Sequence, residues 1–293
     1  MKARTTYVIL FVILVAAFSG IVPRAWAQSK SDLVMGLIPA ENNEEIRKTF
    51  EPMRAYLEKK LNRHVKMYTA TDYSSIIEAM KKKRVDIAFF GPLSYVLAEQ
   101  EAGAEAFAVG VEGNRKTYKS LFVVPGNSPI KSIQDLQGKS VAFVDPASTS
   151  GSLVPSYLVK KATGKMPQEY FGKLTYAGSH DASELAVKNR SVDAAADNDI
   201  TYASMIQKGL ITPQTNRVLI ESDPIPGSPL VYRKDLDPAT KAAIRNAILT
   251  AHNEIKVTGY GKITRYDATS SADYQVVRDM VKELGLRKEQ MLQ

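Results

Sequence analysis

The chain has 293 residues, a formal net charge of +8, no cysteine and only three histidines. The absence of cysteine excludes disulfides, thiol catalysis, cysteine zinc sites and a lipid-bearing cysteine, and so few histidines argue against a transition-metal centre. The basic residues are scattered along predicted helices and do not form the aromatic-interleaved stripe of a nucleic-acid binder. We therefore expect no nucleic-acid partner, no metal and no cofactor.

The first 27 residues have the pattern of a cleavable secretory leader. Lys2 and Arg4 supply positive charge, residues 7–18 are almost entirely apolar, and the tripeptide that ends at Ala27 has the small-x-small cleavage pattern. The alternative is an uncleaved membrane anchor, which needs roughly 20 apolar residues, more than this run contains. We expect residues 1–27 to be removed and the mature protein to be soluble in a Gram-negative periplasm, with a net charge near +5 that mildly suits an anionic solute.

The first part of the mature chain alternates predicted strands and helices. The apolar residues of the first helix recur at helical spacing, and each buried strand ends in a turn signal. This alternation predicts parallel strands with helices on both faces, an α/β architecture. The strands are expected at residues 33–38, 65–68 and 85–90, and the helices at 44–61, 73–83 and 94–101.

The pattern then starts again, which predicts a second lobe. The helix before Val85-Asp86 resembles the helix before Val192-Asp193, and we interpret this as two similar α/β lobes; chance likeness of generic helix–strand units is the alternative. Strands are expected at residues 120–124, 141–144, 174–176, 192–196, 218–220 and 230–232, and helices at 133–136, 152–161, 182–189, 238–257 and 272–284.

The chain is expected to cross between the two lobes twice. Three prolines between Pro224 and Pro229 predict a stiff, extended return crossing. The first lobe is assigned residues 28–124 and 229–293, and the second lobe is assigned residues 125–228. A hinge with two crossings allows such lobes to close on a ligand.

The strongest candidate site is Ser148-Thr149-Ser150 followed by Gly151. A predicted strand ends here and a helix begins, and Pro155 places the helix start near Ser150 or Gly151 because proline is tolerated only in the first turn. Hydroxyls and free backbone N–H groups at a helix start form an anion site that needs no cationic side chain. The alternative is ordinary N-capping, for which one hydroxyl would be enough.

Further candidates follow other strand ends, where ligands bind in open α/β sheets. Tyr73 opens a helix, although a simple cap by the preceding aspartate is the alternative. Phe90 and Tyr95 flank another strand-to-helix turn, and His180 could donate a hydrogen bond to an oxyanion. A catalytic triad of Ser150, His180 and Asp181 is not expected, because adjacent His and Asp side chains cannot readily act as base and orienting group.

These motifs together resemble the phosphate, phosphite and phosphonate binding proteins of ABC importers, which have the two-lobe type II periplasmic binding-protein fold with mostly parallel sheets. The resemblance covers nearly the whole mature chain. It is carried by GLIPAEN at residues 36–42, TDY at 71–73, VDIAFFGP at 85–92, DPASTSG at 145–151, GSHD at 178–181 and PIPGSP at 224–229.

The resemblance implies roles for individual residues. Ser148, Thr149, Ser150 and His180 would hold the phosphoryl oxygens, Tyr73 would approach from the other lobe, and Phe90 and Tyr95 would line the cleft. Aminoalkylphosphonate-binding members carry acidic residues for the ammonium group. This chain places Ile200, beside Asp199, and Ser228 at those positions. We therefore expect a ligand without an amine: phosphite, methylphosphonate or another phosphonate, or phosphate. A one-residue shift that brings Asp199 into the site would weaken this expectation.

Three classes of function are compared. The first is the solute-binding component of an ABC importer, whose partners are the permease and its ATPase. The second is an enzyme such as a phosphoesterase, which needs a metal cluster or an activated nucleophile, and neither is visible in the sequence. The third is a sensor module of the same fold that passes its ligand signal to a membrane partner. We expect the first, and no enzymatic activity.

Overall fold

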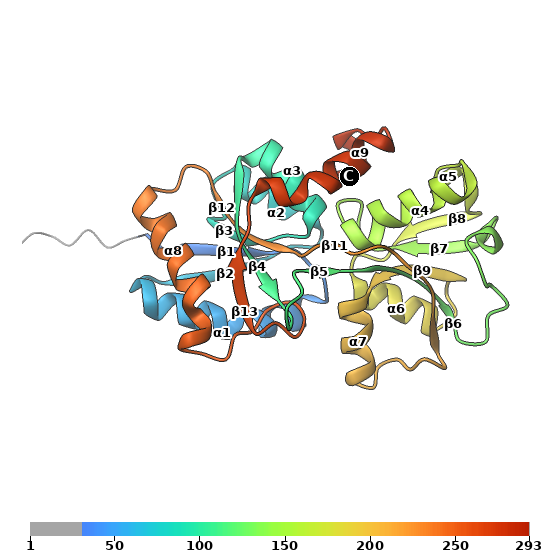
Figure 1. Ribbon diagram of the computed structural model, residues 1–293, viewed down its shortest axis with the longest axis horizontal. Helices are drawn as coiled ribbons and strands as arrows, with labels where there is room; N and C mark the ends of the chain where they lie inside the picture. Colours follow the sequence, from blue (N-terminus) through green and yellow to red (C-terminus); the bar gives the residue numbers. More distant parts are fainter. Residues whose placement is uncertain (1–30, 293) are drawn as a thin grey trace, which may run out of the picture. The chain divides into compact units, whose positions relative to one another are not determined.

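The computed structural model describes residues 31–292. The predicted leader, residues 1–27, lies outside the described residues. The described chain forms two large sheets, each with helices on both faces, and a two-stranded ribbon that joins them (Figure 1).

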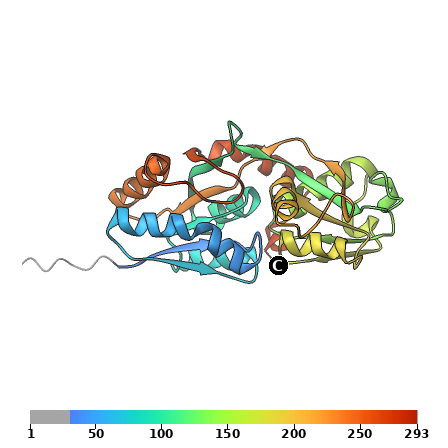
Figure 2. The same ribbon diagram turned by 90° about the horizontal axis from the view of Figure 1, so that it is seen from below.

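The first sheet has the strand order β13-β4-β12-β3-β1-β2. Helices α1 and α8 pack on one face, where they lie side by side (Figure 2), and α2, α3 and α9 cover the other. The strands are β1 (Leu33–Leu37), β2 (Val65–Thr69), β3 (Ile87–Phe89), β4 (Ala104–Val111), β12 (Pro229–Arg233) and β13 (Arg265–Ala268). The helices are α1 (Asn43–Leu61), α2 (Tyr73–Lys81), α3 (Pro92–Ala102), α8 (Pro238–Thr250), α9 (Gln275–Glu283) and α10 (Lys288–Met291), with 3-10 turns η3 (Ala251–Asn253) and η4 (Ser271–Tyr274).

The second sheet has the strand order β10-β6-β9-β7-β8. Helices α6 and α7 pack on one face, and α4 and α5 lie on the other. The strands are β6 (Ser120–Pro125), β7 (Ser140–Phe143), β8 (Lys173–Tyr176), β9 (Ala194–Asn198) and β10 (Asn216–Glu221). The helical segments are η1 (Gln134–Leu136), η2 (Thr149–Leu153), α4 (Val154–Thr163), α5 (Pro167–Tyr170), α6 (His180–Lys188) and α7 (Asp199–Gln207).

The two lobes repeat one unit, and the Val-Asp signature has a structural cause in both. In the first lobe the Asp86 carboxylate accepts the backbone N–H of Val34 at 2.8 Å. In the second lobe the Asp193 carboxylate accepts the N–H of Ser140 at the same distance. Each aspartate thus satisfies a donor at the start of the neighbouring parallel strand, β1 or β7, that would otherwise be unpaired.

The sheets are mixed, whereas the sequence predicts mostly parallel ones. Parallel pairing joins β2-β1-β3 in the first lobe and β8-β7-β9 in the second. Strands β12 and β6 run antiparallel to the strands beside them, because each enters its sheet directly from the hinge instead of through a crossover helix. The edge strand β13 also pairs antiparallel, and neither it nor β4 is predicted from the sequence.

The first chain crossing lies earlier than the predicted boundary after Val124. Strand β6 pairs with β9 and β10 and therefore belongs to the second lobe from Ser120 onward. The short strand β5 (Thr117–Tyr118) pairs with β11 (Ile225–Pro226) and forms the ribbon between the sheets. The boundary was placed too late because an apolar sequence indicates that a strand is buried but does not indicate which sheet it joins.

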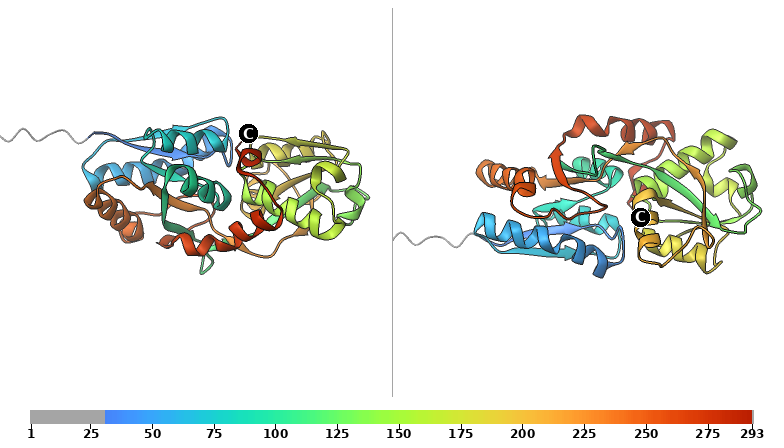
Figure 3. Two further views of the ribbon diagram at one scale, coloured as in Figure 1. Left: turned by 90° about the horizontal axis from the view of Figure 1, so that it is seen from above. Right: turned by 60° about the horizontal axis from the view of Figure 1, so that its bottom comes forward.

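Helix α9, near the C-terminus, contacts both α3 and the η2 segment of the second lobe (Figure 3). Met280 on α9 packs against a small apolar cluster formed by Tyr118, Val154 and Ile225, which covers the hinge ribbon. The segment η2 is therefore held between elements of both lobes, and it carries the strongest sequence-predicted site.

Candidate ligand-binding site

A small, largely buried cavity lies where the carboxyl ends of β1, β3, β7 and β9 meet. Its cavity volume is about 10 Å³, far below the roughly 300–1,000 Å³ of typical small-molecule pockets. Its size therefore favours a ligand of a few heavy atoms. The lining residues are Ile38, Ala40, Tyr73, Phe89, Gly91, Tyr118, Ser148, Thr149, Ser150, His180, Asn198, Ser228 and Tyr260.

Five helix starts converge on this cavity. Tyr73 and His180 are the first residues of α2 and α6, and Gly91, Ser148 and Asn198 are the N-cap residues of α3, η2 and α7. Helix N-termini carry partial positive charge and unpaired N–H groups, so several of them together favour an anion. No lysine, arginine, aspartate or glutamate is among the described lining residues. The positive potential of the site comes from backbone dipoles.

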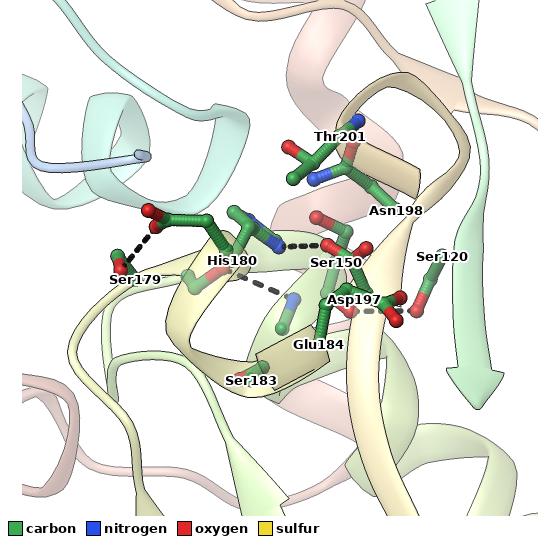
Figure 4. Close-up of polar contacts among 12 residues, drawn as sticks. Ser120, Ser150, Ser179, His180, Ser183, Glu184, Asp197, Asn198 and Thr201 are labelled. Carbon is green, nitrogen blue, oxygen red and sulfur yellow. Dashed lines mark hydrogen bonds and ion pairs between the residues drawn. The ribbon is translucent and has the colours of Figure 1, made fainter. Parts of the chain in front are cut away.

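The Ser148–Ser150 segment is arranged so that its hydroxyl hydrogens stay available. Ser148 Oγ accepts the N–H of Gly151 at 3.0 Å, and Thr149 Oγ1 accepts the N–H of Leu93 from the first lobe at 2.7 Å. Because both oxygens accept from backbone donors, their O–H groups can donate into the cavity. The Ser120 hydroxyl holds the Ser150 carbonyl at 2.6 Å (Figure 4).

Gly151 is required by close packing at the start of the helix. A Cβ atom at this position would lie 2.3 Å from Val144 Cγ2, closer than any real contact. The helix begins at Thr149, just before the predicted start at Ser150 or Gly151, through the π-type turn η2, and Pro155 lies in the first turn of α4. The wide turn therefore places the hydroxyl-bearing residues at the cavity without a break in the following helix.

His180 lies on the second-lobe side of the cavity and is 3 % exposed. Its Nδ1 lies 2.7 Å from Asp197 Oδ1 on strand β9, while Asp181 Oδ2 accepts from the Asn42 side chain. Burial lowers the pKa of His180 to about 4, so the imidazole is neutral at neutral pH. Among the described residues, His180 forms no side-chain hydrogen bond with a serine hydroxyl. The pairing therefore does not build a nucleophilic triad.

Contacts between the lobes close the cavity on the other sides. The Tyr73 N–H donates to Asp145 Oδ2 at 3.2 Å, and burial raises the pKa of Asp145 to about 6. The Tyr260 hydroxyl accepts from Asn198 Nδ2 at 2.8 Å and lies 2.6 Å from Thr201 Oγ1. Hydrogen bonds from both lobes therefore enclose the space.

Three of the predicted site residues do not line the cavity. Phe90 is fully buried in the first-lobe core, and because side chains alternate along an extended chain its neighbour Phe89 faces the cavity instead. Tyr95 packs edge-on against Tyr274 and donates to Glu99 at 2.8 Å. Asp199 accepts the N–H of Lys119 at 3.0 Å and lines a separate, larger depression. The other predicted residues, Tyr73, Ser148, Thr149, Ser150, His180 and Ser228, all line the cavity.

Sequence reasoning missed Phe89, Tyr118, Asn198 and Tyr260. Asn198 could have been found from the sequence, because it comes two residues after a predicted strand. Tyr118 lies in the hinge strand β5, and Tyr260 lies in a loop after α8. Neither position carries a local sequence signal, since only tertiary packing brings it to the cavity.

Comparison with known proteins identifies the family. A family model described as the periplasmic phosphonate substrate-binding protein of an ABC transporter matches residues 35–274. The chain belongs to this family. The resemblance inferred from the motifs is thereby confirmed, and the chain is a substrate-binding component of an ABC transporter. The family consists of binding proteins rather than enzymes, and its description gives no support to the sensor alternative.

Individual relatives agree with this assignment. The chain is 30 % identical to the phosphonates-binding periplasmic protein of Escherichia coli, covering 89 % of this chain and 78 % of that protein. It is 34 % identical to the phosphate-import protein of Mycolicibacterium smegmatis, covering 70 % and 67 % of the two chains.

Solved structures confirm the fold class. A phosphonate-transporter binding protein of Pseudomonas aeruginosa matches with a TM-score of 0.79 and 25 % identity over 87 % of both chains. A Prochlorococcus marinus protein solved with methylphosphonate matches with a TM-score of 0.78 and 23 % identity, covering 87 % of this chain and 98 % of that one.

Residues 31–292 contain neither a group of metal ligands nor a membrane-spanning helix. In this part of the chain no three His, Asp or Glu side chains are placed to share a metal ion. No helix within it combines the length and the apolar character that a membrane span needs.

Proposed function

We propose that the protein captures a small phosphorus oxyanion without an amine (phosphite, methylphosphonate or phosphate) and delivers it to the permease and ATPase of an importer. The observation that carries the proposal is the convergence of five helix starts and three consecutive hydroxyl residues on one small cavity. Export through the leader to the periplasm, without catalysis, is part of the same proposal. The lobes, divided at the ribbon of β5 and β11, would open and close about it to admit the ligand.

The proposed lack of an amine rests on the charges around the cavity. An ammonium group enclosed there would meet no carboxylate among the described lining residues, and an unpaired buried charge is strongly unfavourable. Ser228 lines the cavity in place of an acid, and Asp199 lies outside it. These positions support the argument from Ser228 and weigh against a role for Asp199 in the site.

Calorimetric titration of the mature protein tests the proposal. Phosphite, methylphosphonate, phosphate, 2-aminoethylphosphonate and sulfate are compared under one set of conditions. We expect the tightest binding from one of the first three ligands. Binding to none of the phosphorus compounds would overturn the proposed function, and a clear preference for 2-aminoethylphosphonate would overturn only the exclusion of amines.

Tyr260 is expected to set the upper size of the ligand. It lines the small cavity, while its neighbours Gly259 and Gly261 line the larger depression together with Glu41 and Asp199. Its ring, whose centroid is 5.7 Å from that of Phe89, therefore lies at the boundary between the two spaces.

The substitution Tyr260→Ala should join these two spaces. We expect weaker methylphosphonate binding and a gain of at least about tenfold in the affinity for 2-aminoethylphosphonate relative to methylphosphonate, because the ammonium can then approach Glu41 and Asp199. Tyr260→Phe is the matched control, since it removes only the hydroxyl and keeps the ring as a barrier. An unchanged ligand preference in Tyr260→Ala would show that Tyr260 does not limit ligand size.

A further inference from the structure

Behind His180, on the side away from the cavity, lies a fully buried pair of acidic residues. Glu184, one turn further along α6, and Asp197 on β9 are both 0 % exposed and lie next to each other (Figure 4). A side-chain hydrogen bond joins their carboxyl groups. One oxygen of each, Glu184 Oε1 and Asp197 Oδ2, accepts no hydrogen bond from any described donor. Two carboxyl groups can bond to each other only if one of them carries a proton.

Asn216 fixes which oxygen of Glu184 can carry a proton. Its Nδ2 donates to the Glu184 backbone carbonyl at 2.8 Å, and a carbonyl oxygen can only accept, so the amide orientation is fixed. The same Nδ2 donates to Glu184 Oε2 at 2.6 Å, which leaves Oε1 to carry the proton and donate to Asp197. Burial raises the pKa of Glu184 well above its usual range, and Asp197 raises it further. Burial raises the pKa of Asp197 well above its usual range as well. The hydrogen bond between the two groups raises the pKa of Glu184 and lowers that of Asp197, which assigns the shared proton to Glu184, although the bond from Asn216 acts to lower the pKa of Glu184.

This arrangement determines the tautomer of His180. An ionised Asp197 that already accepts a hydrogen bond from the Glu184 carboxyl group accepts a second one from His180 Nδ1, 2.7 Å away. The neutral imidazole then carries its single proton on Nδ1, and Nε2 has a free lone pair. No described residue forms a hydrogen bond with Nε2, and His180 lines the cavity. A hydrogen-bond acceptor is thus presented to the ligand.

The charges around His180 disfavour a second negative charge on the ligand. Besides Asp197 and Glu184, the acids that face it are Glu41 from the first lobe, Asp145 after β7, and Asp181 beside it on α6. Lys208, the cation that acts on Glu41, is already paired with Glu45 at 2.6 Å. The imidazole itself is neutral, so a doubly charged oxyanion would meet surrounding carboxyl groups without a buried counter-charge.

We propose that the Glu184–Asp197 pair positions His180 as an acceptor for a P–OH group, so that the site selects the singly protonated form of a phosphorus oxyacid over isosteric sulfonates. The inference rests on the proposed function and specifies its ligand. The complex holds one proton between His180 Nε2 and a ligand oxygen. When the free ligand is a dianion, that proton is taken up from solvent on binding; when the free ligand is a monoanion, the ligand brings it.

Methylphosphonate and methanesulfonate form the matched ligand pair for the test, because they have similar shape and differ in the ionisable proton. We expect methanesulfonate to bind at least roughly ten- to hundredfold more weakly, since it leaves a buried acceptor without a partner. Calorimetry in buffers of different ionisation enthalpy should show uptake of about one proton where methylphosphonate is a dianion and almost none where it is a monoanion. Above the second pKa of the ligand, the affinity should fall about tenfold per pH unit.

Asp197→Asn removes the charge that fixes the tautomer. Its amide can donate to Nδ1, which allows His180 to carry its proton on Nε2 and donate to a dianion. We expect a flatter pH profile and a smaller preference for methylphosphonate over methanesulfonate, effects that a purely structural role of Asp197 does not produce. If Asp197→Asn keeps the pH profile of the wild type and its preference for methylphosphonate over methanesulfonate, the inference is overturned.

If Asp197→Asn does not fold, nitrogen-15 NMR of the wild-type protein can determine which nitrogen of His180 carries the proton. His64, His180 and His252 are the three histidines of the chain, so the signals can be assigned. Free protein at neutral pH should show a neutral His180 with the proton on Nδ1. A proton on Nε2, or equal binding of methanesulfonate, would overturn the inference and leave the proposed function standing. If methylphosphonate, phosphite and phosphate all fail to bind, the proposed function itself is wrong.

Discussion

Replacing Ser148, Thr149 and Ser150 together with alanine is expected to weaken binding of the preferred oxyanion by about 4 kcal/mol or more, roughly a thousandfold, because each charge-assisted hydrogen bond contributes about 1.5–3 kcal/mol. All three residues are at most 2 % exposed and line the cavity. Calorimetric titration of the triple variant and of each single variant measures the loss. The single substitution Thr149→Ala also removes the acceptor of the Leu93 N–H, so it should weaken contact between the lobes as well.

Ser152→Ala is the matched control for this series. Ser152 lies in the same η2 segment and is buried, but it does not line the cavity. Circular dichroism and thermal unfolding of every variant separate a binding effect from a folding defect. If the folded triple variant binds within tenfold of the wild type, these hydroxyls do not hold the ligand.

The helix-start motifs could be identified from the sequence because their physical signal is local. A strand end, a run of hydroxyl residues and a proline in the first turn together define the position of Ser148–Ser150, and a similar strand end precedes His180. The repeated Val-Asp signature also predicted two similar lobes, and its cause lies in one neighbouring strand: each aspartate accepts an N–H near the start of that strand. Such features depend on residues close in sequence or on one neighbouring strand.

The rest of the site depends on contacts that local patterns do not encode. The choice of Phe90 over Phe89 failed because a run of buried apolar residues has no polar alternation to show which side chain faces the cavity. Tyr260 lies in a loop and reaches the site from a distant part of the sequence. Its hydroxyl forms a hydrogen bond with Thr201, which is 59 residues earlier in the chain. The strand β6 was assigned to the wrong lobe for a similar reason, since its pairing with β9 and β10 is long-range.

The buried acid pair shows a further limit of sequence reasoning. Glu184 lies at the expected spacing for an exposed cap near the start of α6, and glutamate is almost never fully buried without a partner. Its burial becomes understandable only with Asp197 and Asn216, which come from strands β9 and β10. The sequence does not reveal that this glutamate is neutral, because its protonation results from desolvation and from a carboxylate 13 residues away.

Glu184→Gln is expected to stabilise the folded protein at pH 7 by up to about 3–4 kcal/mol. The pKa of Glu184 is raised in the folded state, so the folded protein retains a proton that the unfolded chain releases above its own pKa of about 4.3. The unfolded state therefore binds fewer protons at neutral pH, and the stability contributed by neutral Glu184 is lost as the pH rises from about 4.3 toward 7. Glutamine needs no proton: its amide can donate to Asp197 while its carbonyl oxygen accepts from Asn216.

Urea unfolding of the wild type and Glu184→Gln at pH 4.5 and pH 7 measures this effect, which should be small at the lower pH and large at the higher one. Glu99→Gln is the control of opposite sign. Burial acts to raise the pKa of Glu99, but hydrogen bonds from Ser271, Arg278 and Tyr95 outweigh it and lower the pKa, so this substitution should destabilise the protein at pH 7. The quantity compared is the difference in the free energy of unfolding between the variant and the wild type. If this difference favours the variant less at pH 7 than at pH 4.5, Glu184 is ionised in the folded protein. The single proton between Glu184 and Asp197, on which the tautomer of His180 depends, would then be absent.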